Sequence, residues 1–324
     1  MSSARRSARP SRPSWRPSRK QELREGRAPS LFSWPGAASC SLRACSFQSG
    51  GGAVAQGKVW FIGAGPGDPE LITVKGARLI SSADLVVFAG SLVPVQVLAI
   101  ARAGVPLIDS APLSLPETHA LLRDCVRSGG LAARVHTGEP SLYGAVREQA
   151  ALLDADGIDW DVVPGVSSAF ATAAAAKVSL TVPGGPQTVI ISRLSGRTPV
   201  PEAEALPKLA AHGAALAVLL SAGEPERLQA ELLEGGYAPD TLVVLGHKVG
   251  WPGGETVRTR LADLAETARS HGFTRQTVFL VLPGQDLPAG ASQSKLYDPG
   301  FTHGLREGQE FGNGPDDTGR EGED

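Results

Sequence analysis

Short apolar runs and helical patterns alternate along most of this chain, and this alternation restricts its fold more than any other feature. The first apolar run, at 58–62, leads into a glycine-rich turn at 63–70 and then into a helical pattern. Parallel strands need crossover connections, so this alternation predicts a mainly parallel sheet with helices on both faces. Further strands are predicted at 85–88, 106–108, 131–136 and 160–163, and helices at 71–80, 95–101, 118–126, 145–153 and 167–176.

A second series of strands and helices follows the Pro/Gly cluster at 183–186, where we predict a domain boundary. We therefore expect an α/β protein with two α/β domains, at 58–183 and 184–306. In the second domain, strands are predicted at 187–192, 215–220, 241–245, 256–260 and 276–282, and helices at 202–211, 224–233 and 261–270.

Charge is distributed unevenly along the 324 residues, although the net charge is only −2. Residues 1–57 carry ten Lys/Arg and two acids, and residues 307–324 carry one Arg and seven acids, which leaves −4 for 58–306. Nucleic-acid binding needs basic charge on the folded part, so we expect no nucleic-acid partner. Residues 1–57 lack apolar periodicity, and residues 307–324 are rich in Gly and acids, so both ends are predicted to be disordered. For the basic extension, an organelle transit peptide and a non-ATG translation start at Val54 are alternative hypotheses.

Cysteine and histidine usage points to a reducing compartment and to no metal site. Cys40, Cys45 and Cys125 are too few for a disulfide framework, so a cytoplasmic location is expected. Cys125 lies on the apolar side of a predicted helix and is interpreted as core filling. The six histidines lack metal-ligand spacing, and no nucleophile–base pair is evident. No apolar run approaches the roughly 20 residues of a membrane-spanning helix, so no membrane contact is expected.

The turn at 63–68 joins a strand to a helix, as a dinucleotide-binding loop does. That loop needs a third glycine where Asp68 stands, and a carboxylate at a helix N-terminus repels a pyrophosphate. A nicotinamide oxidoreductase is therefore disfavoured. Two interpretations stay open for the turn: a ligand site poor in side chains, or an ordinary turn that Asp68 caps.

Two more loops follow predicted strands. Residues 136–144 read His-Thr-Gly-Glu-Pro-Ser-Leu-Tyr-Gly, and residues 164–168 read Pro-Gly-Val-Ser-Ser. Each loop by itself is also explained by a helix N-cap. Ligands of parallel sheets bind outside the carboxyl ends of the strands, so three such loops together predict one binding rim.

Taken together, these loops resemble the tetrapyrrole methylase family of S-adenosylmethionine-dependent enzymes. The segment 63–73, Gly-Ala-Gly-Pro-Gly-Asp-Pro-Glu-Leu-Ile-Thr, is similar to the family's first signature. The likeness covers about 58–306, and its details imply methylation of precorrin-4 at carbon 11 in cobalamin biosynthesis. The segments that carry this finer resemblance are 88–93, 136–144, 164–168, 187–190, 196–199, 294–299 and 301–304, together with Arg193.

The resemblance implies a cofactor cleft between the two α/β domains, and a homodimer. Two positions depart from the family pattern. The family usually has Asp where Glu139 stands, and its late Arg-Gly-Thr-Leu element reads Arg-Thr-Arg-Leu at 258–261, without the glycine. By position, the resemblance places S-adenosylmethionine, and its product S-adenosylhomocysteine, against Pro66, Thr137, Gly138, Glu139, Leu142, Ser167, Ser168 and Ser221.

Methyl transfer from a sulfonium needs no enzymic nucleophile, because the substrate carbon attacks and a neutral thioether leaves. A general base can assist proton loss, and Glu139 and His136 are the candidates. The tetrapyrrole substrate is edged with carboxylates, so cationic side chains should bind it. The predicted binders are Arg147, Arg193, Arg197 and Lys248, for each of which a solvated surface position is the alternative.

Three other functions stay open from the sequence. The first is a sibling enzyme that methylates another ring position or uroporphyrinogen. The second is a relative that methylates rRNA or protein, and the third is a cofactor-binding protein without catalysis.

Overall fold

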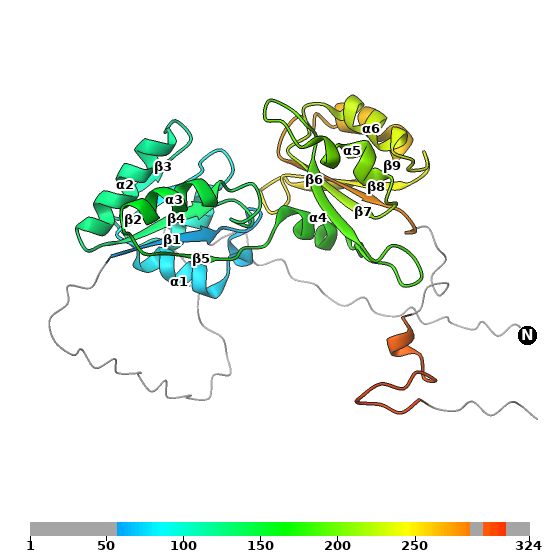
Figure 1. Ribbon diagram of the computed structural model, residues 1–324, viewed down its shortest axis with the longest axis horizontal. Coiled ribbons are helices and arrows are strands. Elements are labelled where there is room, and N and C mark those ends of the chain that lie inside the picture. The colour runs from blue at the N-terminus through cyan, green and yellow to red at the C-terminus, as the bar shows by residue number, and fades with distance from the viewer. Residues whose placement is uncertain (1–56, 286–293, 309–324) are drawn as a thin grey trace, which may run out of the picture. The chain divides into compact units, whose positions relative to one another are not determined.

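The computed structural model describes residues 57–285 and 294–308. The predicted basic extension, with Cys40 and Cys45, and most of the predicted acidic tail lie outside these residues. The described strands form two five-stranded sheets, which confirms the expected α/β class (Figure 1). No helix in the described part of the chain is long and apolar enough to span a bilayer.

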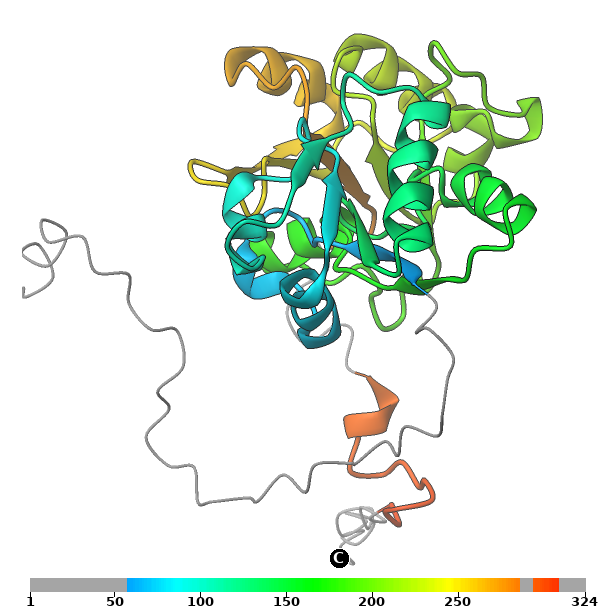
Figure 2. The same ribbon diagram turned by 90° about the vertical axis from the view of Figure 1, so that its left-hand side faces the viewer.

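The first sheet is entirely parallel, as the alternation predicted. Its strand order is β3-β2-β4-β1-β5. Helices cover both faces, because α1 and a 3-10 helix, η3, pack on one apolar cluster while α2 and α3 pack on the other (Figure 2). The strands are β1 (Lys58–Gly63), β2 (Leu85–Phe88), β3 (Leu107–Asp109), β4 (Leu131–His136) and β5 (Trp160–Val163). The helices are η2 (Pro69–Leu71), α1 (Val74–Ser82), η3 (Val95–Ile100), α2 (Leu115–Arg127) and α3 (Val146–Ala155).

The second sheet has the order β6-β7-β10-β8-β9 and is mostly antiparallel. Only β6 and β7 run parallel; the β8–β9 connection carries no helix, so these two strands pair as antiparallel neighbours. Its strands are β6 (Val189–Arg193), β7 (Ala215–Leu219), β8 (Leu242–His247), β9 (Glu255–Arg260) and β10 (Thr277–Leu282). The helices are η4 (Glu202–Glu204), α5 (Leu206–Ala210), α6 (Pro225–Glu234), η5 (Leu261–Asp263) and α7 (Leu264–Ser270); a separate short helix is η6 (Lys295–Tyr297).

Helix α4 (Ser168–Ala176) packs on the second sheet, although it precedes the predicted boundary at 183–186. Its Ala169, Ala173 and Ala176 lie in one apolar cluster with residues of β7, β8 and β10, whereas α5, α6 and α7 cover the opposite face. A Cβ on Gly246 of β8 would lie 2.4 Å from the Thr172 side chain, so glycine there allows α4 to approach the sheet. The boundary itself stays a prediction.

Two predicted helices take a different form in the structure. The segment near 95–101 is a 3-10 helix, and its β-branched Val95, Val97 and Ile100 have low α-helical propensity. The helix predicted at 202–211 is divided into η4 and α5, because Pro207 removes the amide that a continuous helix would need. Cys125 is half-buried against the apolar cluster beneath α2 and α3, which confirms its interpretation as core filling.

Candidate functional site

The parallel register brings three strand ends to one edge of the first sheet. Gly63, the last residue of β1, pairs with His136 of β4, and Ile62 pairs with Val163 of β5. The three glycine-containing loops singled out in the sequence therefore leave the sheet side by side. This is the edge at which parallel sheets bind ligands.

Backbone contacts lock these loops together. The Gly138 amide donates to the Gly65 carbonyl at 2.8 Å, and the Gly65 amide donates to the Gly138 carbonyl at 3.3 Å. A Cβ on Gly165 would lie 2.0 Å from the Gly138 carbonyl oxygen and 2.8 Å from the Cα of Gly63. Real Cβ atoms do not approach so closely, so the three loops meet only because these positions lack side chains.

Glu139 connects two of the loops through both of its carboxylate oxygens. Its Oε2 accepts from the Gly165 amide at 2.8 Å, and its Oε1 accepts from the Ser141 amide at 3.0 Å. Burial raises the pKa of the Glu139 carboxyl, but these hydrogen bonds outweigh burial and the pKa is lowered overall. The carboxylate thus stays ionised at neutral pH and holds the loop in place. A lowered pKa also makes it a weak base.

A cavity of about 870 Å³ opens beside these loops. Residues of both sheets line it, including the exits of β7 and β8 and the start of β10. Its size is in the range of small-molecule and cofactor sites, roughly 300–1,000 Å³. Of the residues predicted from the sequence, it is lined by Pro66, His136, Thr137, Gly138, Glu139, Leu142, Ser167, Ser168 and Lys248.

Two side chains that line the cavity have buried polar atoms without a hydrogen-bond partner among the described residues. They are Nε2 of His136 and Oγ1 of Thr172. Buried polar atoms are rarely left unpaired, so they indicate a polar ligand. The glycine at position 138, whose added Cβ would meet nothing closer than 3.7 Å, also leaves space beside the loop. This cavity therefore fits a ligand of nucleoside size with polar groups.

His136 is held in its neutral form. The residue is 5% exposed, and burial, helped by the nearby charge of Arg134, lowers its pKa to about 3. A neutral imidazole is able to accept a proton in principle, but a pKa this low makes it a poor base at neutral pH. The structure thus favours a hydrogen-bonding role for His136 over proton abstraction.

Burial of neutral His136 predicts a loss of stability in mild acid. Below about pH 6.5 the unfolded chain gains a proton at this histidine, whereas the folded chain does not until about pH 3. Lowering the pH from 7.5 to 5 should therefore remove about 2 kcal/mol of unfolding free energy through this residue. Urea unfolding at both pH values should show this difference in the unaltered chain and a loss smaller by that amount in His136→Gln. Equal pH dependence in both proteins would contradict the prediction.

Two residues that the sequence did not single out join the loops of the two sheets. The indole Nε1 of Trp251, in the turn after β8, donates to the Pro66 carbonyl at 3.1 Å. Nε2 of Gln276 donates to the Ser91 carbonyl at 2.9 Å. Both residues line the cavity. The Gly-Trp-Pro-Gly-Gly turn at a strand exit was the available signal for Trp251; nothing local marked Gln276.

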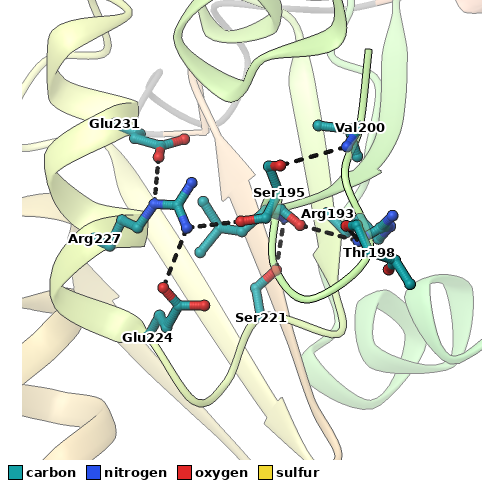
Figure 3. A network of polar contacts seen from close by, with 9 residues as sticks. Arg193, Ser195, Thr198, Val200, Ser221, Glu224, Arg227 and Glu231 are labelled. Atoms are coloured by element: carbon teal, nitrogen blue, oxygen red, sulfur yellow. Dashed lines mark hydrogen bonds and ion pairs between the residues drawn. The ribbon is translucent and has the colours of Figure 1, made fainter. Parts of the chain in front are cut away.

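Ser221 and Arg193 belong to a network beside β6 and β7 (Figure 3). Ser221 Oγ donates to the Leu219 carbonyl at 2.7 Å and accepts from the Leu194 amide at 2.9 Å. The Arg193 guanidinium donates to the Thr198 carbonyl at 2.9 Å and the Pro199 carbonyl at 3.1 Å. Neither residue lines the cavity, although Leu219, Leu220 and Ala222 around Ser221 do.

The remaining predicted cations differ in their position. Lys248 lines the cavity, whereas Arg147 and Arg197 are exposed and do not. Arg193 lies close enough to Tyr143 for its charge to act on the phenol, and Tyr143 lines the cavity. Arg193 thus lies near the cavity, and its guanidinium orders the loop that carries Arg197.

Comparison with known proteins relates this site to methyltransferases. The model of the Tetrapyrrole (Corrin/Porphyrin) Methylases matches residues 58–265. A cobalt-precorrin-4 C(11)-methyltransferase from Priestia megaterium is 44% identical over 255 residues, which are 78% of this chain and 98% of that protein. A precorrin-4 C(11)-methyltransferase from Pseudomonas aeruginosa is 42% identical over 252 residues, 78% of this chain and 99% of that protein.

Solved structures share the fold. The X-ray structure of a cobalt precorrin-4 methyltransferase, a cobalamin biosynthetic enzyme, has a TM-score of 0.68 and 44% identity, covering 69% of this chain and 94% of that one. A uroporphyrin-III C-methyltransferase from Thermus thermophilus, complexed with S-adenosylhomocysteine, has a TM-score of 0.57 and 26% identity, covering 70% and 97%. The two sheets described above therefore have the arrangement found in these enzymes.

Proposed function

We propose that this chain, which belongs to the tetrapyrrole (corrin/porphyrin) methylases, transfers a methyl group from S-adenosylmethionine to carbon 11 of precorrin-4 or cobalt-precorrin-4 in cobalamin biosynthesis. The observation that carries this proposal is the cavity at the three interlocked loops, with its glycine-lined space and unpaired polar atoms. The chain is 44% identical to a solved enzyme named for cobalt precorrin-4 and 26% identical to one named for uroporphyrin-III. This difference supports precorrin-4 over a uroporphyrin-type substrate.

S-adenosylmethionine, when bound, supplies a methyl group on a sulfonium, so catalysis rests on positioning and on exclusion of water. In this proposal the loop at 137–142 and the start of α4 would hold the cofactor, together with Pro66, whose carbonyl accepts from the Trp251 indole. Glu139 positions the loop through the Gly165 and Ser141 amides and would contact the cofactor from there. Ser221 contributes by joining the exits of β6 and β7.

The tetrapyrrole would lie against the cationic side of the cavity. Lys248 and Arg275 line it, and Arg193 orders the loop at 194–199 that carries Arg197. These cationic groups would bind the carboxylates at the edge of the substrate. An arginine can do so through two parallel hydrogen bonds from its guanidinium. Arg147, at the exposed start of α3, lies outside the cavity lining but follows Gly144 and Ala145, which are part of it.

A labelling experiment tests the function. The purified chain is incubated with methyl-labelled S-adenosylmethionine and separate pools of tetrapyrroles, RNA and protein. We expect label in the tetrapyrrole pool alone. Within that pool the labelled product should derive from precorrin-4 or cobalt-precorrin-4, and NMR should locate the new methyl group at carbon 11. Label in RNA or protein, or at another ring carbon, would favour one of the alternatives and refute this proposal.

Arg193→Ala should weaken binding of the tetrapyrrole without weakening binding of the cofactor. Loss of the guanidinium frees the Thr198 and Pro199 carbonyls and with them the loop at 194–199, which lies outside the cavity lining proposed for S-adenosylmethionine. We expect KM for the tetrapyrrole to rise about tenfold. The Kd of S-adenosylhomocysteine, measured by calorimetry, should stay within twofold of the unaltered chain. Equal losses in both would reject a substrate role for Arg193.

The homodimer and the cytoplasmic location implied by the resemblance and by cysteine usage are part of the same proposal. Sedimentation of the purified chain tests the first, and fractionation of the producing cell tests the second.

A further inference from the structure

Arg134 lines the cavity but has no role in the function proposed above. It is in β4, two residues before His136, so both side chains lie on the same side of the sheet. The residue is only 9% exposed. An arginine buried to this degree in a parallel strand needs an explanation, because charged groups are rarely buried without a partner.

Neutral groups satisfy part of the Arg134 guanidinium. Nε donates to Gln149 Oε1 at 2.9 Å, and Nη1 donates to Ser110 Oγ at 3.0 Å and to the Val87 carbonyl at 3.4 Å. Within residues 57–285 and 294–308, Nη2 makes no hydrogen bond and no carboxylate forms an ion pair with the group. The edge of the guanidinium that carries Nη2 is left for a ligand in the cavity.

The carboxylate whose charge acts on Arg134, that of Asp109, is already engaged elsewhere. Asp109 acts on Arg134 at a distance, but its Oδ1 accepts from the Gly90 amide and the Ala111 amide, each at 2.8 Å. Burial lowers the pKa of Arg134 to about 10, which leaves the guanidinium charged at neutral pH. The cavity therefore contains a desolvated cation whose counter-charge is incomplete.

We propose that Arg134 binds a carboxylate of the ligand in this cavity through the free edge of its guanidinium. The inference rests on the proposed function, which offers two carboxylates: that of the methionyl part of S-adenosylmethionine, and one at the edge of the tetrapyrrole. Both have the planar geometry that a guanidinium recognises. Gln149 helps to orient Arg134, because its amide also donates to the Gly144 and Ala145 carbonyls and so cannot turn away.

The test compares Arg134→Met with the unaltered full-length chain. Calorimetry measures the affinities of S-adenosylhomocysteine and of its decarboxylated analogue, and steady-state kinetics measure KM and kcat for the tetrapyrrole. If the carboxylate belongs to the cofactor, the unaltered chain prefers S-adenosylhomocysteine about ten- to hundredfold, and Arg134→Met loses that preference. If the carboxylate belongs to the substrate, Arg134→Met keeps the preference for S-adenosylhomocysteine. Its KM for the tetrapyrrole then rises about ten- to hundredfold, while kcat changes little.

Two matched variants separate ligand binding from a structural role. Ser110→Ala removes one hydrogen bond to Arg134 but keeps its charge and its bond to Gln149, so the cofactor preference and KM should both change far less than in Arg134→Met. Arg134→Lys keeps the charge but lacks the planar guanidinium, so it should show a smaller effect of the same kind. If Arg134→Met does not fold, Arg134→Lys takes its place in the test. The inference is overturned if cofactor preference and KM are both unchanged, or if both cofactor ligands weaken equally at unchanged KM. An unaltered chain that methylates no tetrapyrrole would refute the proposed function instead.

Discussion

Gly165→Ala is expected to reduce methyl transfer by on the order of a hundredfold, because displacing bound groups by about 1 Å has effects of that size. The added Cβ would lie 2.0 Å from the Gly138 carbonyl oxygen and 2.8 Å from the Cα of Gly63. These are backbone atoms of two neighbouring loops, so no side-chain rotation relieves the contact. The loop after β5 must move away from the loops after β1 and β4. This displacement also breaks the bond from the Gly165 amide to Glu139.

The same variant should be less stable. Overpacking of a tight site costs about 1–3 kcal/mol, and the absence of any yielding side chain places Gly165→Ala at the upper end. Gly196→Ala is the matched control, because its Cβ would meet nothing closer than 4.0 Å. Thermal unfolding and S-adenosylhomocysteine binding should both be near normal in the control. A Gly165→Ala chain with unchanged cofactor affinity would show that the three loops do not form the site.

Gly138→Val should also lose cofactor binding, for a different reason. A Cβ at this position has space, since its nearest neighbour would be 3.7 Å away, but the two valine methyl groups extend into the cavity that the cofactor is proposed to fill. The backbone φ of +58° adds strain for a β-branched residue. We expect the affinity for S-adenosylhomocysteine to fall by more than about a hundredfold, in line with a clash that binding cannot relieve.

Gly138→Ala is the control for backbone strain. It carries a φ penalty of roughly 1–2 kcal/mol, without the methyl groups that reach into the cavity. Both variants should therefore lose stability in urea, Gly138→Val more because valine is β-branched, whereas calorimetry should find a large loss of affinity in Gly138→Val alone. If the two variants bind S-adenosylhomocysteine equally, the cofactor does not lie beside Gly138.

The departure at Glu139 has a geometric explanation in this chain. The resemblance implies the shorter Asp here, yet the Glu139 carboxylate reaches both the Ser141 amide within its own loop and the Gly165 amide in the next. The additional methylene is compatible with holding two loops together. This arrangement, with its lowered pKa, is more consistent with positioning than with the base role considered from the sequence.

Local sequence patterns were sufficient to predict the strands. Short apolar runs predicted all the described strands to within a few residues, and the glycine-rich loops at their ends lie beside the candidate cavity. The resemblance then supplied the family, which the comparisons confirmed. The predictions of helices were less accurate where proline or β-branched residues competed with the helical pattern, as at Pro207 and Val95.

The sequence by itself determined the strands, the loops at their ends and the family, because these depend on periodicity and on residues that are neighbours along the chain. Only the tertiary structure decided that α4 packs on the second sheet, that Trp251 and Gln276 join loops 185 residues away in sequence, and that Arg134 faces the cavity. Such contacts depend on which strands become neighbours and on how closely the backbones approach. That information resides in packing between distant segments, and no local pattern of residues carries it.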